Sequence, residues 1–433
     1  MSLPPIISID PLRRLPEAQI VVPGSKSITN RALILAAQAN GKSRLEGALW
    51  SDDTQVMVAC LQRLGYEIEI LADASEPSNR TLIVEGRAGQ IPEGGTLDEP
   101  VDLFVGNAGT AARFLLAFLC LGAGCYRLHG VDRMHERPQA ALVHALRQLG
   151  YRIDSPEDKL PLVIHGGGRR EATCQVDISE SSQFASALLL ASEHGGWSVE
   201  FTGRSLEQSP YVKMTQELIR QFGRCDDSFQ IEPDASSGSY FWACNALGID
   251  ESAKTDSSGS ELDVSVKNWP VSGWQIDAEF PRYLNCDDPL SRDRHLGDSI
   301  MTSIVLAARA PEKRSFVDLG RLRVQECERV KALRTELGRC GIVVEEVADT
   351  LIVEPGILQP ALIETYDDHR IAMCFSVLAL SASGIRIKDP SCVKKTFPTF
   401  YQKLATPAPN GLGVTVRDGE TGAKLAGDDL VAR

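Results

Sequence analysis

Residues 23–37 carry the side chains that could hold a small anion. An extended apolar run ends at Pro23-Gly24, serines flank Lys26, and a helix is predicted to begin there with Arg31 about one turn in. The first N–H groups of a helix lack partners inside the helix, so with two cations they favour a phosphate or a carboxylate. A nucleotide P-loop is not indicated, because its pattern needs a second glycine. The alternative for this segment alone is a capped helix with two surface cations.

Further segments place charged or hydroxyl side chains where helices are predicted to begin, at residues 104–113, 132–138, 179–183, 323–329, 366–370 and 392–398. Each taken alone also fits a tight turn, a solvated loop or a capped helix start. Together with the first segment they hold Lys26, Arg31, Arg113, Arg133, Arg137, Arg323, Arg329, Arg370, Lys394 and Lys395. So many cations near helix starts, in a chain of formal net charge −13, predict one or two small substrates with several negative charges.

The composition excludes several classes of protein. A net charge of −13 argues against nucleic acid or an anionic membrane as a partner. Eleven cysteines without a C-x-x-C pair show no zinc spacing and indicate reduced thiols in the cytoplasm. No apolar run reaches the roughly 18 residues of a membrane span, and the first residues lack a signal-peptide layout. We expect a cytoplasmic protein, which at 433 residues has two or more domains.

A pattern of about sixty to eighty residues recurs six times along the chain. Each unit has an apolar helix, a strand, an amphipathic helix and a strand pair. The apolar helices are predicted to be buried and to begin near Ser27, Asn107, Ser181, Ser236, Gly297 and Asp367. The amphipathic helices are predicted at residues 52–65, 139–150, 211–223 and 326–338, each ended by a glycine.

The fourth unit is irregular, with a polar loop expected at residues 250–261 and a short helix remnant at 277–284. Six similar α/β units fit either one solenoid or two three-fold domains. If the apolar helices lie parallel, their positive ends meet in one region and attract anions.

The motifs occur in an order that resembles the 5-enolpyruvylshikimate-3-phosphate (EPSP) synthase family. From about Val22 to Tyr401 they read PGSKSxxNR, GNAGTxxR, RMxERP, SSQFxSALLLA, DASSxSYF, a Gly-Asp helix start, RVxExxR, YxDHRxAMxF and KTFP. The resemblance implies a monomeric transferase without metal or organic cofactor. It would move the carboxyvinyl group of phosphoenolpyruvate to the 5-hydroxyl of shikimate 3-phosphate, on the route to chorismate and the aromatic amino acids.

The resemblance also implies a domain organisation, with two similar domains of three βαβαββ units each. The chain would cross between them near Pro23 and near Tyr240. One domain would comprise residues 24–240 and the other residues 1–23 and 241–433, with the substrates in the cleft between them.

Site roles are implied position by position. The phosphoenolpyruvate contacts would be Lys26, Gly109, Arg133, Gln183, Arg329, Arg370 and Lys395. The shikimate 3-phosphate contacts would be Lys26, Ser27, Arg31, Ser181, Ser182, Gln183 and Asp298. The catalytic residues would be Asp298 near the acceptor hydroxyl, and Glu326 with Lys26 near the enol of the donor.

Three positions depart from the family pattern. The lysine before the catalytic glutamate is Gln325 here, the asparagine ahead of that motif is Arg321, and a serine near the Pro-Tyr pair is Gln208. All three would face the acceptor, so the donor half looks complete and the acceptor half altered, although Arg321 could supply the cation lost at Gln325. The alternatives are a carboxyvinyl transferase for another alcohol and a non-catalytic binder of phosphorylated metabolites.

Overall fold

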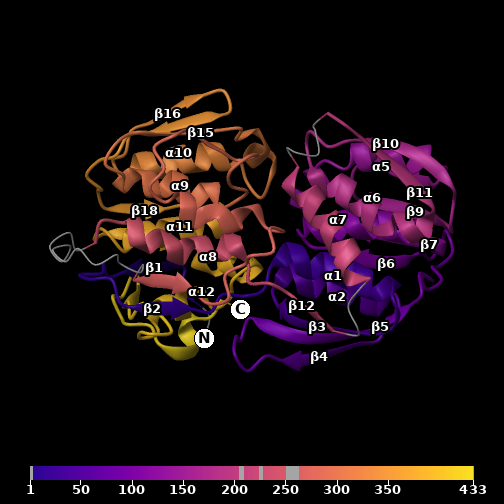
Figure 1. The fold of residues 1–433 in the computed structure, drawn as a ribbon, viewed down its shortest axis with the longest axis horizontal. Coiled ribbons are helices and arrows are strands. Elements are labelled where there is room, and N and C mark those ends of the chain that lie inside the picture. The colour runs from indigo at the N-terminus through magenta and orange to yellow at the C-terminus, as the bar shows by residue number, and fades with distance from the viewer. Residues whose placement is uncertain (1–2, 204–208, 224–227, 250–262, 433) are drawn as a thin grey trace. The chain divides into compact units, whose positions relative to one another are not determined.

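The structure is a computed structural model that describes residues 3–203, 209–223, 228–249 and 263–432 (Figure 1). The chain forms two compact units. Unit 1 comprises Met1–Pro23 and Pro233–Arg433, and unit 2 comprises Gly24–Glu232. The second boundary lies before the expected Tyr240, because Asp234 caps a helix whose side chains pack in the core of unit 1.

Unit 2 has the element order α1 (Lys26–Gln38), β3 (Asn40–Leu49), α2 (Asp52–Arg63), β4 (Ile68–Ala72), β5 (Asn79–Arg87), β6 (Val101–Phe104), α3 (Gly109–Leu119), β7 (Ala123–His129), α4 (Asp132–Glu136), α5 (Ala140–Gln148), β8 (Arg152–Asp154), β9 (Leu162–Gly167), β10 (Ala172–Asp177), α6 (Ser182–Gly195), β11 (Trp197–Thr202), α7 (Pro210–Phe222) and β12 (Ser228–Gln230).

The three apolar helices expected in unit 2 are α1, α3 and α6, and they pack against one another. Every residue of α3 is buried, as its sequence GTAARFLLAFL, apolar nearly all round, requires. The amphipathic helix α7 begins with Pro210, whose fixed φ suits a first helical position, and it turns Val212, Thr215 and Leu218 inward. Helix α7 packs against α1 and α6 and encloses the buried layer.

The sheets of unit 2 repeat one pairing pattern. The four-stranded sheets β12-β3-β5-β4 and β6-β7-β9-β8 each have a parallel first pair followed by antiparallel pairs. Strands β10 and β11 form a parallel pair. Strand β12, at the end of the unit, joins β3 near its beginning, so the first and last segments of the unit are tied together.

Unit 1 has the element order β1 (Ile6–Ile9), β2 (Ala18–Ile20), α8 (Ala235–Ala243), β13 (Val264–Val266), β14 (Leu290–Ser291), α9 (Ile300–Leu306), β15 (Arg314–Val317), α10 (Arg329–Arg339), β16 (Val344–Val347), β17 (Thr350–Val353), β18 (Ala361–Ile363), α11 (His369–Ala379), β19 (Ile385–Lys388), α12 (Phe400–Ala405) and β20 (Val416–Asp418).

Unit 1 repeats the architecture of unit 2. Its apolar helices α8, α9 and α11 contact one another, and its sheets β14-β15-β17-β16 and β18-β19-β1-β20 show the same parallel-then-antiparallel pairing. Strand β1 pairs with β19 and β20, with Ile7 opposite Ile387, which is why the first residues belong to this unit. The six expected buried helices and the α/β fold class are therefore confirmed.

Two expected helices differ in detail from the structure. In the expected helix remnant at 277–284, residues 277–283 lie in a 3₁₀ helix, Ile276–Tyr283, and not in an α-helix. Helix α10 runs past Gly338, and the left-handed residue after it is Gly341. The loop expected at 250–261 lies outside the described residues. Within the described ranges, none of the helices has the length and apolar character needed to cross a membrane.

Asp277 joins the starts of two buried helices of unit 1. Its carboxylate accepts hydrogen bonds from Ser236 Oγ at 2.6 Å, Gly297 N at 2.8 Å, Ser299 N at 3.0 Å and Ser299 Oγ. The residue is only 4% exposed, so these donors have little access to water as a substitute. Asp277 therefore fixes the start of α9 against α8.

We predict that Asp277→Ala lowers the free energy of unfolding by about 3 kcal/mol, because it leaves several buried donors without an acceptor. Urea unfolding measures the loss. The matched control is Asp288→Ala, which removes an exposed carboxylate from the same segment. An equal effect of the two substitutions would contradict this account of Asp277.

Candidate active site

The starts of α3 and α6 are joined through Gln183. Arg113 Nη1 donates to Gln183 Oε1 at 2.6 Å, and Gln183 Nε2 donates to Thr110 Oγ1 at 3.2 Å. Ser181 caps α6 by accepting from Gln183 N, and Ser182 is the buried first residue of that helix. The two helix starts are thus joined through Gln183 in one hydrogen-bonded group.

Lys26 begins α1 and forms an ion pair with Asp53. Its Nζ lies 3.0 Å from Asp53 Oδ2, at the start of α2. Both side chains are mostly buried, at 16% and 7% exposure, so the pair fixes where the ammonium group lies. Asp53 was not identified from the sequence, because two adjacent aspartates at a helix start are also common helix-capping residues.

Arg31 is buried and links α1 to its neighbours. It donates to Ser27 O at 2.8 Å, Thr215 Oγ1 at 2.7 Å and Ser186 Oγ at 3.0 Å, and it lies over the ring of Phe114. Burial lowers its pKa to about 10, so the guanidinium stays charged at neutral pH. In this structure Arg31 fastens α1 to α6 and α7, and its expected contact with the acceptor stays a prediction.

The motif 132–138 contains two arginines in different surroundings. Arg133 is exposed and pairs with Glu136 at 2.6 Å. Arg137 is buried and donates to Asn107 O at 2.9 Å. A Cβ added to Gly109 would lie 2.5 Å from Arg137 Nη2. The structure therefore brings Arg137 to the start of α3, and the contact expected between Arg133 and phosphoenolpyruvate stays a prediction.

In unit 1 Asp298 lies among three arginines. One carboxylate oxygen is 2.7 Å from Arg292 Nη2, and the other is 3.3 Å from Arg370 Nη2 and 3.8 Å from Arg329 Nη1. Burial would raise the pKa of Asp298, but Arg370, Arg292 and Arg329 outweigh burial and hold the pKa well below its usual range. Asp298 is consequently ionised and well fixed.

Arg329 forms a two-point ion pair with Asp368. Its Nε and Nη2 lie 2.7 and 3.2 Å from the two oxygens of that carboxylate, in the paired geometry that arginine favours. Asp368 also caps α11 by accepting from Arg370 N at 2.9 Å. Burial would lower the pKa of Arg329, but Asp368 and Asp298 raise it above its ordinary value. One carboxylate therefore fixes the side chain of Arg329 and the backbone of Arg370 at the start of α11.

Glu326 forms an ion pair with Lys395, at the end of the 3₁₀ helix Pro390–Lys395. Both side chains are mostly buried. Nearby, burial raises the pKa of Asp367, with Lys395 opposing the shift and Glu326 adding to it. A carboxylate beside an ammonium group and a second carboxyl is an arrangement that can give and receive protons.

Of the three positions that depart from the family pattern, Gln325 contacts Asp298. Gln325 Nε2 is 3.4 Å from Asp298 Oδ1, and Gln325 Oε1 accepts from Arg329 Nη1 at 2.6 Å. Arg321 is buried within the 3₁₀ helix Gly320–Val324. Gln208 lies outside the described residues.

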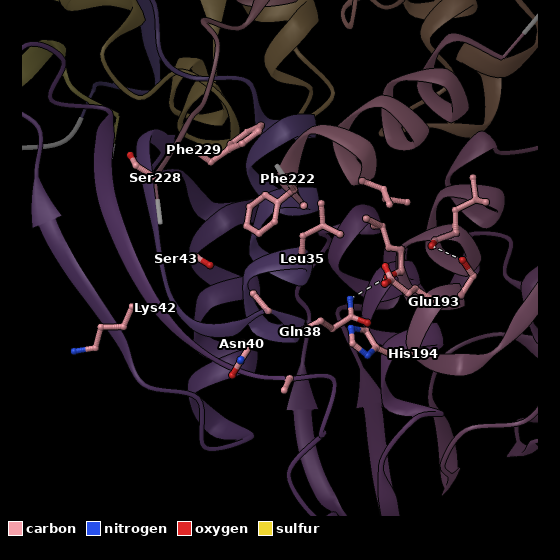
Figure 2. Close-up of a pocket in the computed structure, with 17 residues that line it drawn as sticks. Leu35, Gln38, Asn40, Lys42, Ser43, Glu193, His194, Phe222, Ser228 and Phe229 are labelled. Carbon is pink, nitrogen blue, oxygen red and sulfur yellow. Dashed lines mark hydrogen bonds between the residues drawn. The ribbon is translucent and has the colours of Figure 1, made fainter. Parts of the chain in front are cut away.

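A cavity of about 420 Å³ in unit 2 lies at the C-terminal ends of α1, α6 and α7 (Figure 2). Leu35, Phe222 and Phe229 line it, near the last turns of α1 and α7. The expected anion-binding residues Lys26 and Ser181 are at the first turns of α1 and α6. The cavity therefore does not coincide with the candidate site. Among the described residues, no cluster of His, Cys, Asp and Glu could hold a metal ion.

Comparison with known proteins agrees with these features. The sequence model of the family described as EPSP synthase (3-phosphoshikimate 1-carboxyvinyltransferase) matches residues 12–250 and 293–404. A relative from Nostoc sp. named 3-phosphoshikimate 1-carboxyvinyltransferase is 37% identical over 430 residues, covering 92% of this chain and 98% of the relative. A relative of the same name from Pseudomonas syringae is 36% identical over 452 residues, covering 95% and 98%.

Solved structures show the same fold. The EPSP synthase of Acinetobacter baumannii has a TM-score of 0.66 at 22% identity and covers 95% of this chain and 100% of its own. The enolpyruvyl transferase NikO from Streptomyces tendae has a TM-score of 0.66 at 15% identity, with coverage of 96% and 98%. Because the family model and the relatives span most of its length, this chain belongs to the EPSP synthase family.

Proposed function

We propose that this protein transfers the carboxyvinyl group of phosphoenolpyruvate to the 5-hydroxyl of shikimate 3-phosphate. The products are 5-enolpyruvylshikimate 3-phosphate and phosphate, on the shikimate route to chorismate. The observation that carries the proposal is the group of Asp298, Arg329 and Arg370, together with the Glu326–Lys395 pair. This reaction requires a fixed carboxylate near the acceptor, guanidinium groups that bind phosphate, and a pair of groups that exchange protons with the donor.

The donor is held mainly by cations in this proposal. Arg329, Arg370 and Lys395 bind the phosphate and carboxylate of phosphoenolpyruvate from unit 1, and Lys26 and Gln183 bind it from unit 2. We assign the further arginine contact to Arg137 in place of Arg133, because Arg137 lies beside Gly109 whereas Arg133 is exposed. Fixed guanidinium groups stabilise phosphate charge as it develops and orient the enol.

The acceptor hydroxyl attacks C2 of phosphoenolpyruvate and loses its proton, while C3 gains one, which gives a tetrahedral intermediate. C3 then loses a proton as the C2–phosphate bond breaks. In this proposal Glu326, with Lys26, gives and removes the proton at C3. Asp298 accepts a hydrogen bond from the acceptor hydroxyl, which becomes strongly acidic as its oxygen bonds to C2. Even a carboxylate with a lowered pKa can then take this proton, and it passes the proton to the departing phosphate.

On the acceptor side, Ser181, Ser182 and Gln183 belong to one helix start and suit a phosphate group. Ser27 and Arg31 are assigned to the acceptor by resemblance. A monomeric state, a cytoplasmic location and the lack of a nucleic-acid partner stay predictions from the sequence.

Phosphate release tests the proposed function. We expect the protein to release phosphate from phosphoenolpyruvate only when shikimate 3-phosphate is present, because attack by the acceptor must precede loss of phosphate. The lack of acceptor-dependent release at high protein concentration would refute the proposal. Release with another alcohol, but not with shikimate 3-phosphate, would support the alternative of a different acceptor.

We predict that Glu326→Gln lowers kcat by about 10²- to 10⁴-fold, the usual contribution of a general acid–base group, and leaves phosphoenolpyruvate binding largely intact. Steady-state kinetics and donor titration separate the two effects. Glu345→Gln, the same change at an exposed position of β16, is the control and should behave as the wild type. Turnover of Glu326→Gln within threefold of the control would exclude the catalytic role.

We predict that Gly109→Ala raises the KM for phosphoenolpyruvate about tenfold, which corresponds to about 1.4 kcal/mol. The added Cβ would lie 2.5 Å from Arg137 Nη2 and displace the guanidinium. The thermal unfolding midpoint should change little, because the far end of a long side chain can move. Gly338→Ala, a helical glycine with open space around it, is the matched control. An unchanged KM would remove Arg137 from the donor site.

A further inference from the structure

We propose that Arg292 is a positioning residue that supplies, on the acceptor side of the site, the positive charge that the family motif carries at position 325. This inference rests on the proposed function. It concerns a residue that no motif of the chain includes and that lies just outside the segment 293–404 matched by the family model.

The side chains of Arg292 and Gln325 both contact the same oxygen of Asp298. Arg292 Nη2 lies 2.7 Å from Asp298 Oδ1, and Gln325 Nε2 lies 3.4 Å from that oxygen. The side chains of Arg292 and Asp298 are only 5% and 15% exposed, so water screens their interaction weakly. The guanidinium therefore brings a cation to the carboxylate oxygen that the side chain of residue 325 faces.

The backbone holds Arg292 in place. Strand β14 pairs in parallel with β15, with Ser291 opposite Val317, and Arg292 N donates to Val317 O at 3.2 Å. The next residues turn sharply, since His295 N donates to Ser291 O at 3.0 Å. Arg292 thus follows an edge strand of the sheet and is not part of a free loop. Such a fixed backbone suits a residue that must hold Asp298 in one orientation.

The charges of the cluster explain why Gln325 is tolerated. Asp298 already has Arg292, Arg329 and Arg370 around it, and Asp293 lies 3.7 Å from Arg292 Nη1. A lysine at position 325 would add a further cation next to Arg292. Like charges in a poorly screened site repel, so we infer that Arg292 and a lysine at position 325 are alternatives. The sequence pointed to Arg321 for this role, but the guanidinium at Asp298 Oδ1 is that of Arg292.

Kinetics with each substrate test the inference. We expect Arg292→Gln to raise the KM for shikimate 3-phosphate at least tenfold and to leave the KM for phosphoenolpyruvate within about threefold, because the substitution loosens Asp298 and leaves Arg329 and Arg370 in place. Arg292→Lys, which keeps the charge, should retain more of the acceptor affinity. Arg294→Gln removes an exposed arginine of the same turn and should change neither KM.

Rescue at position 325 is the more decisive measurement. In the Arg292→Gln background, Gln325→Lys should bring the KM for shikimate 3-phosphate back to within about threefold of the wild type. In the wild-type background, Gln325→Lys should give no improvement. If Arg292→Gln alone does not fold, the double variant should still fold and bind the acceptor, which it would not do if the guanidinium served packing alone.

The inference is overturned if, in an active enzyme, Arg292→Gln leaves the KM for shikimate 3-phosphate unchanged or raises both KM values equally. It is also overturned if Gln325→Lys restores nothing in the double variant. Failure of the wild type to use shikimate 3-phosphate would instead refute the proposed function, so the two outcomes are distinguishable.

Discussion

The candidate site in unit 1 depends on buried charges that must neutralise one another. Asp298 and Asp368 are packed with Arg292, Arg329 and Arg370, and removing one partner would leave another charge buried without compensation. Such a cluster contributes little net stability, because the desolvation of each charge offsets much of the attraction. What it provides is orientation, since each guanidinium is held by a carboxylate before any substrate arrives.

The fold supplies the positions at which these charges can be held. Six apolar helices begin with small or polar residues, and their first N–H groups need acceptors. In unit 1 Asp277 and Asp368 supply acceptors inside the protein, and in unit 2 Ser181 does so at α6. A scaffold of buried helices therefore places polar groups at one end of each unit, while the opposite helix ends in unit 2 surround a cavity lined by both apolar and polar side chains (Figure 2).

The two units contribute differently to the proposed chemistry. Unit 2 offers Lys26 held by Asp53, Gln183 held by Arg113, and Arg137 close to Gly109. Unit 1 offers the ionised Asp298 and the Glu326–Lys395 pair. In the proposal made above, the change at position 325 therefore need not weaken the site, because Arg292 reaches the carboxylate that Gln325 also contacts.

The sequence by itself determined the α/β class, the six repeated units, the starts of the buried helices and the family. These follow from local signals, namely apolar periodicity, capping residues and motif order, which act over a few neighbouring residues. Three contacts depend on the tertiary structure alone. Arg137 and not Arg133 lies at Gly109, Asp368 pairs with Arg329, and Arg292 reaches Asp298. Both arginines of the motif look alike as sequence, and only the packing of distant segments makes one buried and the other exposed. Arg292 and Asp277 belong to no recognisable sequence motif. Their contacts form only because strand β14 and the 3₁₀ helix Ile276–Tyr283 pack near the start of α9 in the folded protein.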